Sequence, residues 1–66
     1  KIKMCESNVY LIKDQEEKLI MENAASVTPF DKDFFLIKGI LGERLEVKAT
    51  LEDINLMRNK ILLKAM

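Results

Sequence analysis

One side chain in the sequence stands out for its chemistry, the thiol of Cys5, which directly follows Met4. A thiolate is a soft donor that suits nickel, copper(I) or zinc. This is the chain's only cysteine, and histidine is absent, so a disulfide within the chain and the common cysteine–histidine zinc sites are excluded. One thiolate is a poor metal site by itself. Further donors would have to be backbone nitrogens, carbonyls, water, carboxylates or the same cysteine of a second copy across a two-fold axis.

The remaining side chains form no pattern that is typical of catalysis. We find no nucleophile with a neighbouring base, no glycine-rich phosphate loop and no convergent pair of acids, so we expect that the protein is not an enzyme. Met21 and Met57 are expected to fill the core rather than to bind metal. Phe34 and Phe35 could stack on nucleic-acid bases, but adjacent strand residues point to opposite faces, so we expect one of the two in the core.

Length and charge limit the class of protein further. The 66 residues include 11 basic and 11 acidic ones, and this balance argues against nucleic acid as a partner. No apolar run is long enough for a membrane helix, and no signal peptide is visible. A free cysteine fits a reducing cytoplasm. Because so short a chain buries a small core and has no disulfide or zinc to support it, we expect a homodimer.

The pattern of apolar residues predicts a chain of short strands. Strands are expected over residues 8–13, 18–21, 34–37 and 44–50, an extended segment at 27–29, and turns at 14–17, 31–33 and 41–43. Gly42 should take positive φ in its turn. Leu45, Val47 and Ala49 alternate with charged residues and should face the core. Residues 34–37 form the most apolar run and should be buried on both faces.

The first predicted strand has two different faces. Val9 and Leu11 alternate with Tyr10 and Ile12. If Val9 and Leu11 belong to the core, the other two side chains point outward and form a candidate patch for the dimer.

The last third of the chain supports two interpretations. Thr50 could cap a helix, with Asp53 three residues on, and Ile54 and Ile61 would lie on its apolar stripe. Alternatively, residues 54–57 and 61–63 are strands around a turn at 58–60. A short helical turn near residues 50–53 followed by a hairpin accommodates most of both patterns. We therefore predict an all-β domain over residues 4–66, a small antiparallel sheet or barrel of about five to six short strands with at most a short helical turn near residues 50–53.

The run MCESNVYL at residues 4–11 resembles the N-terminal signature of the CooT family of nickel-binding proteins. These small proteins are associated with maturation of carbon monoxide dehydrogenase and were formerly labelled predicted RNA-binding proteins. The similarity continues over a second strand at residues 19–22, a Gly-Glu turn at 41–43 and a closing segment at 51–53 and 60–63.

The resemblance implies a compact antiparallel β fold, a homodimer and one essential cysteine after the start methionine, which is Cys5 here. It implies a metallochaperone that binds Ni(II) through Cys5, with carbon monoxide dehydrogenase or its nickel-insertion proteins as partners. It also favours strands over a helix near the C-terminus. Two alternatives stay open, a β module that binds RNA and a protein-interaction module with an incidental thiol.

The chain departs from the family pattern at one place, where Lys1, Ile2 and Lys3 precede Met4. These three residues are either a remnant of cloning or an extension from an earlier start. If synthesis starts at Met4 and this methionine is removed, Cys5 carries a free amine, which is a stronger ligand than an amide. With the extension in place, Cys5 has no free amine to offer as a ligand, but its thiolate remains available.

Overall fold

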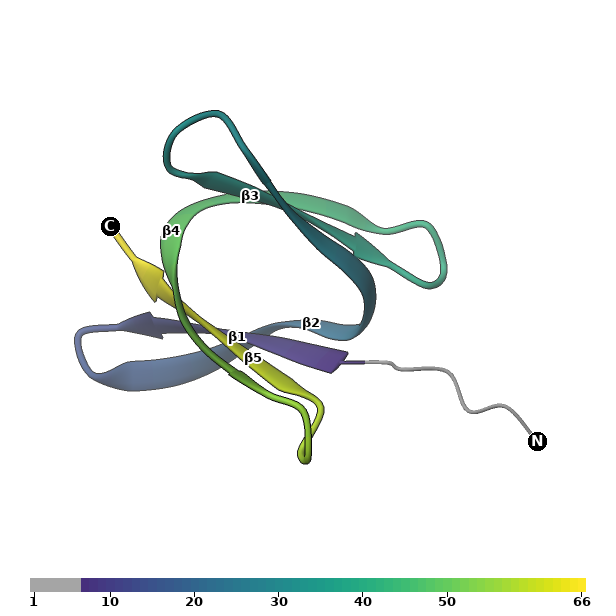
Figure 1. Cartoon of the computed structure of the whole chain (residues 1–66), viewed down its shortest axis with the longest axis horizontal. Coiled ribbons are helices and arrows are strands. Elements are labelled where there is room, and N and C mark those ends of the chain that lie inside the picture. Colours follow the sequence, from purple (N-terminus) through teal and green to yellow (C-terminus); the bar gives the residue numbers. More distant parts are fainter. Residues whose placement is uncertain (1–6) are drawn as a thin grey trace.

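The chain folds into a small barrel of strands. The computed structural model describes residues 7–66, in which it contains five strands and no helix. They are β1 (Ser7–Lys13), β2 (Glu16–Phe30), β3 (Phe34–Gly39), β4 (Arg44–Asn55) and β5 (Lys60–Ala65). Successive strands pair antiparallel, and a parallel pair of β1 with β5 closes the barrel (Figure 1). The predicted all-β class is confirmed.

No helix that could span a membrane occurs among the residues described.

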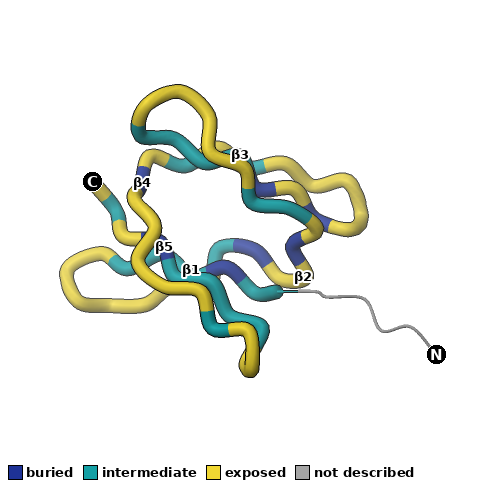
Figure 2. Tube along the Cα trace, viewed as in Figure 1, coloured by how far each residue is buried: buried dark blue, intermediate teal, exposed yellow. Residues whose placement is uncertain are grey.

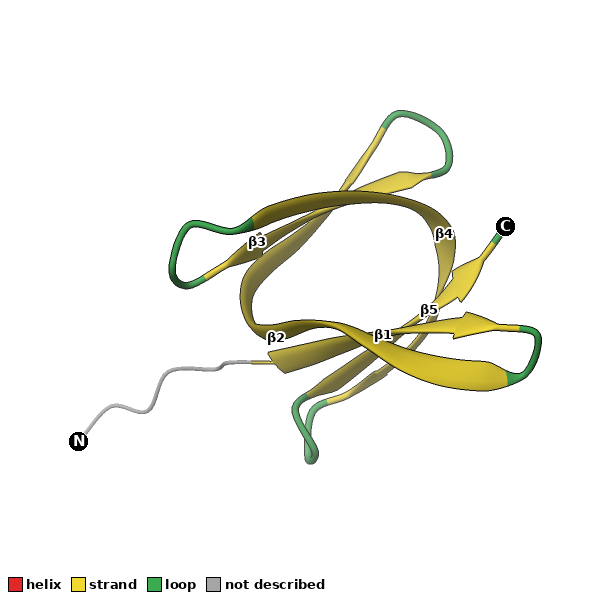
Figure 3. Cartoon of the chain, turned by 180° about the vertical axis from the view of Figure 1, so that it is seen from behind, coloured by secondary structure: helices red, strands yellow, loops and turns green. Residues whose placement is uncertain are grey.

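β2 is the longest strand, and it pairs with two different neighbouring strands in the barrel. Its first half pairs with β1 and its second half with β3, so the predicted strand at 18–21 and the extended segment at 27–29 belong to one element. Asn23 sits at the bend with φ of 55°, and its backbone N–H donates to Oδ1 of Asn8 at 3.2 Å. Irregular pairing at this bend lets the strand curl around the core, as bulges do in small barrels (Figure 3).

β4 runs through residues 50–53, so the choice left open by the local pattern is decided for a strand, as the family resemblance favoured, and the short helical turn that we allowed there does not form. Thr50 pairs with Lys64, and Leu51 pairs with Leu63, so this segment belongs to the sheet. The pairing with β5 is irregular at Glu52, where β4 has one extra residue. Capping residues are a local preference, and here the backbone hydrogen bonds and apolar contacts offered by β5 outweigh it.

The core is narrow and lies along the inside of the barrel (Figure 2). Val9, Ile37 and Leu63 have no exposed area, and they are joined by Met21, Ala24 and Ala49. The predicted alternation at 44–50 is confirmed, because Leu45 and Val47 pack against this cluster and Ala49 belongs to it.

Two predictions about burial are wrong. Residues 34–37 are not buried on both faces, because only Ile37 is fully enclosed. Phe35 packs against the core, whereas Phe34 points outward and its ring centroid lies 5.6 Å from that of Phe30.

The second wrong prediction concerns Met57. Met21 lies in the core as expected, but the side chain of Met57 is 95% exposed in the turn between β4 and β5.

The turns lie close to their predicted positions. Asp14 and Gln15 both have positive φ, 53° and 67°, as in a two-residue hairpin turn of type I′. Gly42 has φ of 95°, which confirms the prediction for this residue. After β4 the chain turns at Asn55, whose Oδ1 accepts hydrogen bonds at 3.1 Å from the N–H groups of Met57 and Arg58. This turn starts two residues before the predicted one at 58–60.

Candidate metal-binding cysteine and the neighbouring cleft

The predicted metal ligand, Cys5, lies outside the residues that the structure describes. The description begins two residues later, at Ser7 in β1. The N–H of Asn8 donates to the carbonyl oxygen of Asn59 at 2.8 Å, which ties the start of β1 to the turn before β5. The surface around Ser7 is therefore the described surface that lies nearest to Cys5 along the chain.

An apolar cleft opens beside Ser7. It has a volume of about 410 Å³ and receives side chains from all five strands. Its lining consists of Ser7, Ala24, Ala25, Ser26, Val27, Pro29, Phe35, Leu51, Ile54 and Ile61. Leu51 and Ile54 are about half exposed, at 49% and 51%. The serine hydroxyls are the polar side chains in this lining, so the cleft favours apolar contacts.

Strand pairing explains how the cleft is assembled. Ile54 of β4 is the register partner of Ile61 of β5, and Pro29 of β2 is the partner of Phe35 of β3. Ile54 and Ile61, which could have shared a helical stripe, thus lie side by side on paired strands. Sequence reasoning missed the cleft because its residues come from five separate segments, and no local pattern marks them as neighbours.

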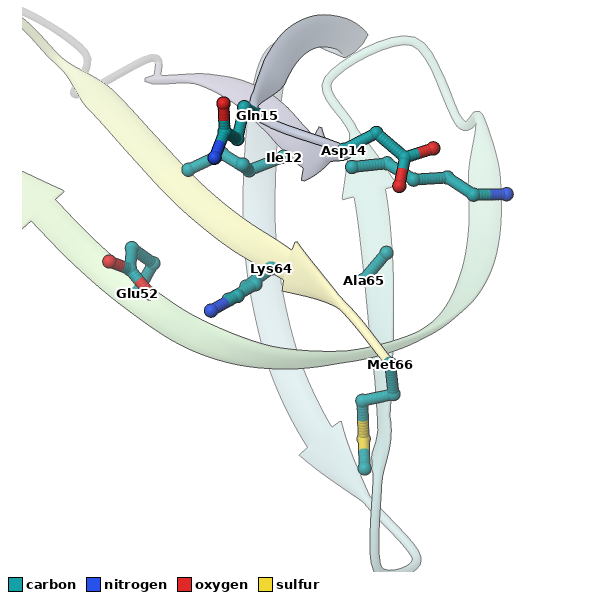
Figure 4. A pocket seen from close by; sticks show the side chains of 8 residues that line it. Ile12, Asp14, Gln15, Glu52, Lys64, Ala65 and Met66 are labelled. Carbon is teal, nitrogen blue, oxygen red and sulfur yellow. The ribbon is translucent and has the colours of Figure 1, made fainter.

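A second cleft, of about 450 Å³, lies at the opposite end of β1, and its lining mixes charged and apolar side chains. Figure 4 shows Glu52 and Lys64 on neighbouring strands, with Asp14 and Gln15 from the first turn on another side. Lys13 completes the charged part of the lining, which contains two lysines and two carboxylates. This balance favours neither an anion nor a cation.

The described residues contain no ready-made metal site. Within residues 7–66, no group of three or more side chains of the Asp, Glu, Cys or His type is placed to hold a metal ion. This part of the chain therefore adds no second candidate to Cys5.

The predicted outward face of β1 carries an apolar strip. Tyr10 has Leu19 of β2 and Leu62 of β5 as its register partners, and Leu19 is 42% exposed. The Nζ of Lys60 lies 4.8 Å from the centroid of the Tyr10 ring and 2.9 Å from Oε1 of Glu17. This surface, which we call the Tyr10 strip, combines apolar side chains with a charged rim.

The phenylalanines do not form the platform on which RNA bases stack in sheet modules. Phe35 packs against the core, and Phe34 faces outward. The two neighbours point to opposite faces, as expected from the sequence. The outward pair of Phe30 and Phe34 is tilted at 47°, and the chain carries no net charge.

Comparison with known proteins identifies the family. A model of the family described as CO dehydrogenase accessory protein CooT matches residues 4–64. No curated protein matches the chain. The fold is similar to the crystal structure of a protein assigned to CooT from Carboxydothermus hydrogenoformans, with a TM-score of 0.84 and 26% sequence identity over 94% of this chain and 98% of that one. With nearly the whole barrel matched, the chain belongs to the CooT family of CO dehydrogenase accessory proteins.

Proposed function

We propose that this CO dehydrogenase accessory protein is a nickel metallochaperone that binds Ni(II) through Cys5 in a homodimer. The observation that carries the proposal is the extent of the family match, which begins at Met4 and so includes Cys5. The Ni(II) ion is cargo for carbon monoxide dehydrogenase or its nickel-insertion proteins. The protein performs no catalytic step, and it works in the cytoplasm, where a free thiol stays reduced.

The chemistry of the donors explains how one cysteine serves such a site. Ni(II) accepts square-planar sets of nitrogen and sulfur donors. The thiolate of Cys5 and the backbone nitrogen of the same residue can close a five-membered chelate ring on one ion. A second copy of the chain can supply the same two donors, which completes the set with no histidine.

The Tyr10 strip is the surface we propose for the dimer. It carries Tyr10 with Leu19 and Leu62 beside it, and Ile12 lies further along the same face of β1. An apolar strip with a charged rim has the anatomy of a protein interface. A two-fold axis through the strip would pair the same residues of both copies.

Nickel titration followed by calorimetry tests the cysteine. We expect the unsubstituted protein to bind Ni(II) and Cys5→Ala to lose this binding, because the alanine removes the thiolate and leaves the fold intact. Cys5→Ser is the matched control, since it keeps the size of the side chain and replaces a soft donor by a hard one. Equal nickel binding by Cys5→Ala, or no binding by any of the proteins, would refute the proposal.

A chain that starts at Met4 should be titrated beside the full sequence. If the initiator methionine is removed, Cys5 gains a free amine and nickel binding tightens. Tighter binding by this shorter chain, together with loss of binding in its own Cys5→Ala variant, would separate the effect of the extension from that of the thiolate.

A further inference from the structure

The outer face of β3 and β4 carries an excess of positive charge. Ile37 is buried, and Leu45 and Val47 pack against the core, so the residues that alternate with them point outward. These outward residues, which we call the β3–β4 face, are Phe34, Leu36 and Lys38 from β3 and Arg44, Glu46 and Lys48 from β4. Three of them are basic and one is acidic, and all four charged side chains are exposed. The face is therefore positive in a chain whose net charge is zero.

Two of these cations stand directly opposite each other. Lys38 and Arg44 are register partners beside the turn between β3 and β4. Like charges in opposed positions of a sheet destabilise the pairing of the strands. Both side chains are exposed, so packing against the core does not require a cation at either position. A local arrangement that costs stability in this way is typical of a binding surface.

Apolar side chains lie in the next two rows of the same face. Leu36 is the register partner of Glu46, and Phe34 is the partner of Lys48. Both apolar side chains are partly exposed. Arginine and aromatic side chains are enriched in protein interfaces. The β3–β4 face thus offers an anionic partner apolar contacts as well as charges.

Glu46 decides which class of anionic partner fits the face. It lies on β4 between Arg44 and Lys48, two residues from each. A nucleic acid carries a negative phosphate on every nucleotide and brings no cation to set against this carboxylate. A protein segment can place a basic residue there, between two acids. Side chains on one side of an extended segment are about 7 Å apart, which is also the spacing of the outward residues of β4.

The β3–β4 face lies apart from the Tyr10 strip, which is formed by β1 and its neighbours β2 and β5. In Figure 1, β3 lies across the barrel from β1 and β5. The charges around the strip are balanced, with Lys60 and Lys64 against Glu17 and Asp53 in neighbouring register positions. A dimer formed through the strip would therefore leave the positive face exposed.

We propose that the β3–β4 face binds an extended acidic segment of a partner protein, in which two acids lie four residues apart with a basic residue midway. The acids pair with Arg44 and Lys48, and the basic residue pairs with Glu46. Lys38 strengthens the positive potential beside Arg44, and Leu36 contributes apolar contact. This inference goes beyond the proposed function, because it involves neither nickel nor the cysteine.

A peptide of defined sequence tests the class of partner. The probe Leu-Ser-Glu-Ser-Lys-Ser-Glu-Ser-Leu has the required spacing and reads the same in both directions. Its matched control, Leu-Ser-Lys-Ser-Glu-Ser-Lys-Ser-Leu, exchanges the acids and the base. In NMR spectra of the unsubstituted protein, millimolar probe should shift the backbone amides of residues 44–48, and the shifts should shrink as salt is added. No shifts with the probe, or equal shifts with both peptides, would overturn the proposal.

A single-stranded RNA of nine nucleotides is the competing probe. We expect it to bind more weakly than the acidic peptide, because its phosphates are repelled by Glu46. Displacement of the peptide by an equal concentration of this RNA would overturn the choice of a protein partner in favour of a nucleic acid.

The variant Lys38→Glu separates binding from folding. It turns the like-charge pair with Arg44 into a pair of opposite charges, so it should raise the midpoint of urea denaturation. The same variant should weaken binding of the probe at least about tenfold, because it places an acid beside a cation that the probe needs. Lys13→Glu makes the same change of charge at an exposed position of β1 and should leave probe binding unchanged.

Three outcomes with these variants would contradict the proposal. Equal weakening by Lys38→Glu and Lys13→Glu would mean that only total charge matters. A lower denaturation midpoint for Lys38→Glu would remove the argument from the like-charge pair. Loss of a dimer in this variant, measured by light scattering, would assign the β3–β4 face to a second copy of the chain. Because no experiment contains nickel, a failure here is distinct from a failure of nickel binding.

Discussion

At the scale of single residues, the barrel depends on few side chains. Val9, Ile37 and Leu63 are the large residues without exposed area, and the small Ala24 and Ala49 fill the space between them. In so short a chain a core of this size supplies only a few kcal/mol in total. Each of these side chains therefore carries a large share of the stability.

Leu63→Ala should remove much of that stability. The truncation leaves a cavity in the centre of the barrel, and such changes cost about 2–5 kcal/mol in buried positions. We expect a large fall in the denaturation midpoint, or a chain that is unfolded at room temperature. Leu56→Ala makes the same chemical change at a side chain that is 81% exposed, and it should alter the free energy of unfolding by less than about 0.5 kcal/mol. Equal effects of both variants would contradict the assignment of the core.

The proposed nickel site predicts a pH dependence that is set by one residue. If Cys5 binds Ni(II) as a thiolate, binding displaces the thiol proton, so apparent affinity should fall as pH falls below the ordinary thiol pKa of about 8.5. Below that pKa, each thiol that must lose its proton weakens the affinity about tenfold per pH unit. Titrations at several pH values measure this slope, and a flat profile would argue against a thiolate ligand.

A residue can be selected from the sequence where its chemistry is rare, whereas its burial depends on neighbours that are distant in the sequence. Cys5 is the only cysteine in the sequence, so it could be named as a candidate ligand from the sequence alone, and its role stays a prediction. Met21 and Met57 are chemically identical, yet one lies in the core and the other is 95% exposed. The difference comes from the partner strand and the turn, which composition does not reveal.

At the scale of elements, the turns and the bends shape the barrel. The predicted positions of the first three turns hold, because charged and small residues interrupt the apolar runs there. The local pattern left the segment at residues 50–53 open between a helical turn and a strand, because its pairing partner, Lys60–Ala65, is distant in sequence. The long β2 was also divided in the prediction, since its bend at Asn23 interrupts the alternation.

The turn between β1 and β2 allows a test in which two glycine variants should change the free energy of unfolding in opposite directions. Gln15 has φ of 67°, which costs a residue with a Cβ about 1–2 kcal/mol, so Gln15→Gly should raise the free energy of unfolding by about 0.5–1 kcal/mol. Lys18→Gly, three residues on in the exposed part of β2, should lower it by a similar amount, because glycine weakens a strand interior. Urea denaturation of both variants measures the difference. Two changes of the same sign would contradict the hairpin geometry.

At the scale of the whole molecule, closure of the barrel leaves two apolar surfaces, the cleft and the Tyr10 strip. Neither could be predicted in full from the sequence. The alternation in β1 placed Tyr10 and Ile12 on one face, but Leu19 and Leu62 join Tyr10 only through strand register. The cleft needs all five strands in place before its lining exists.

Leu19→Glu tests whether the Tyr10 strip forms the dimer. A two-fold axis would bring two of the new charges together in an apolar interface, so the dissociation constant of the dimer should rise at least tenfold, which is about 1.4 kcal/mol. Light scattering coupled to gel filtration measures the shift toward monomer. The control Leu41→Glu changes a side chain that is 84% exposed on the turn between β3 and β4, and should leave the dimer intact. A stable dimer in Leu19→Glu would place the interface elsewhere.

The parallel pair of β1 with β5 has a consequence for how this protein is made. It joins strands roughly fifty residues apart, so the first strand waits for the last one before the barrel can close. Until β5 is available for pairing, the edge of β1 is open to other chains. The barrel therefore closes only once residues 60–65 are available, and a chain cut short before Lys60 is expected to aggregate.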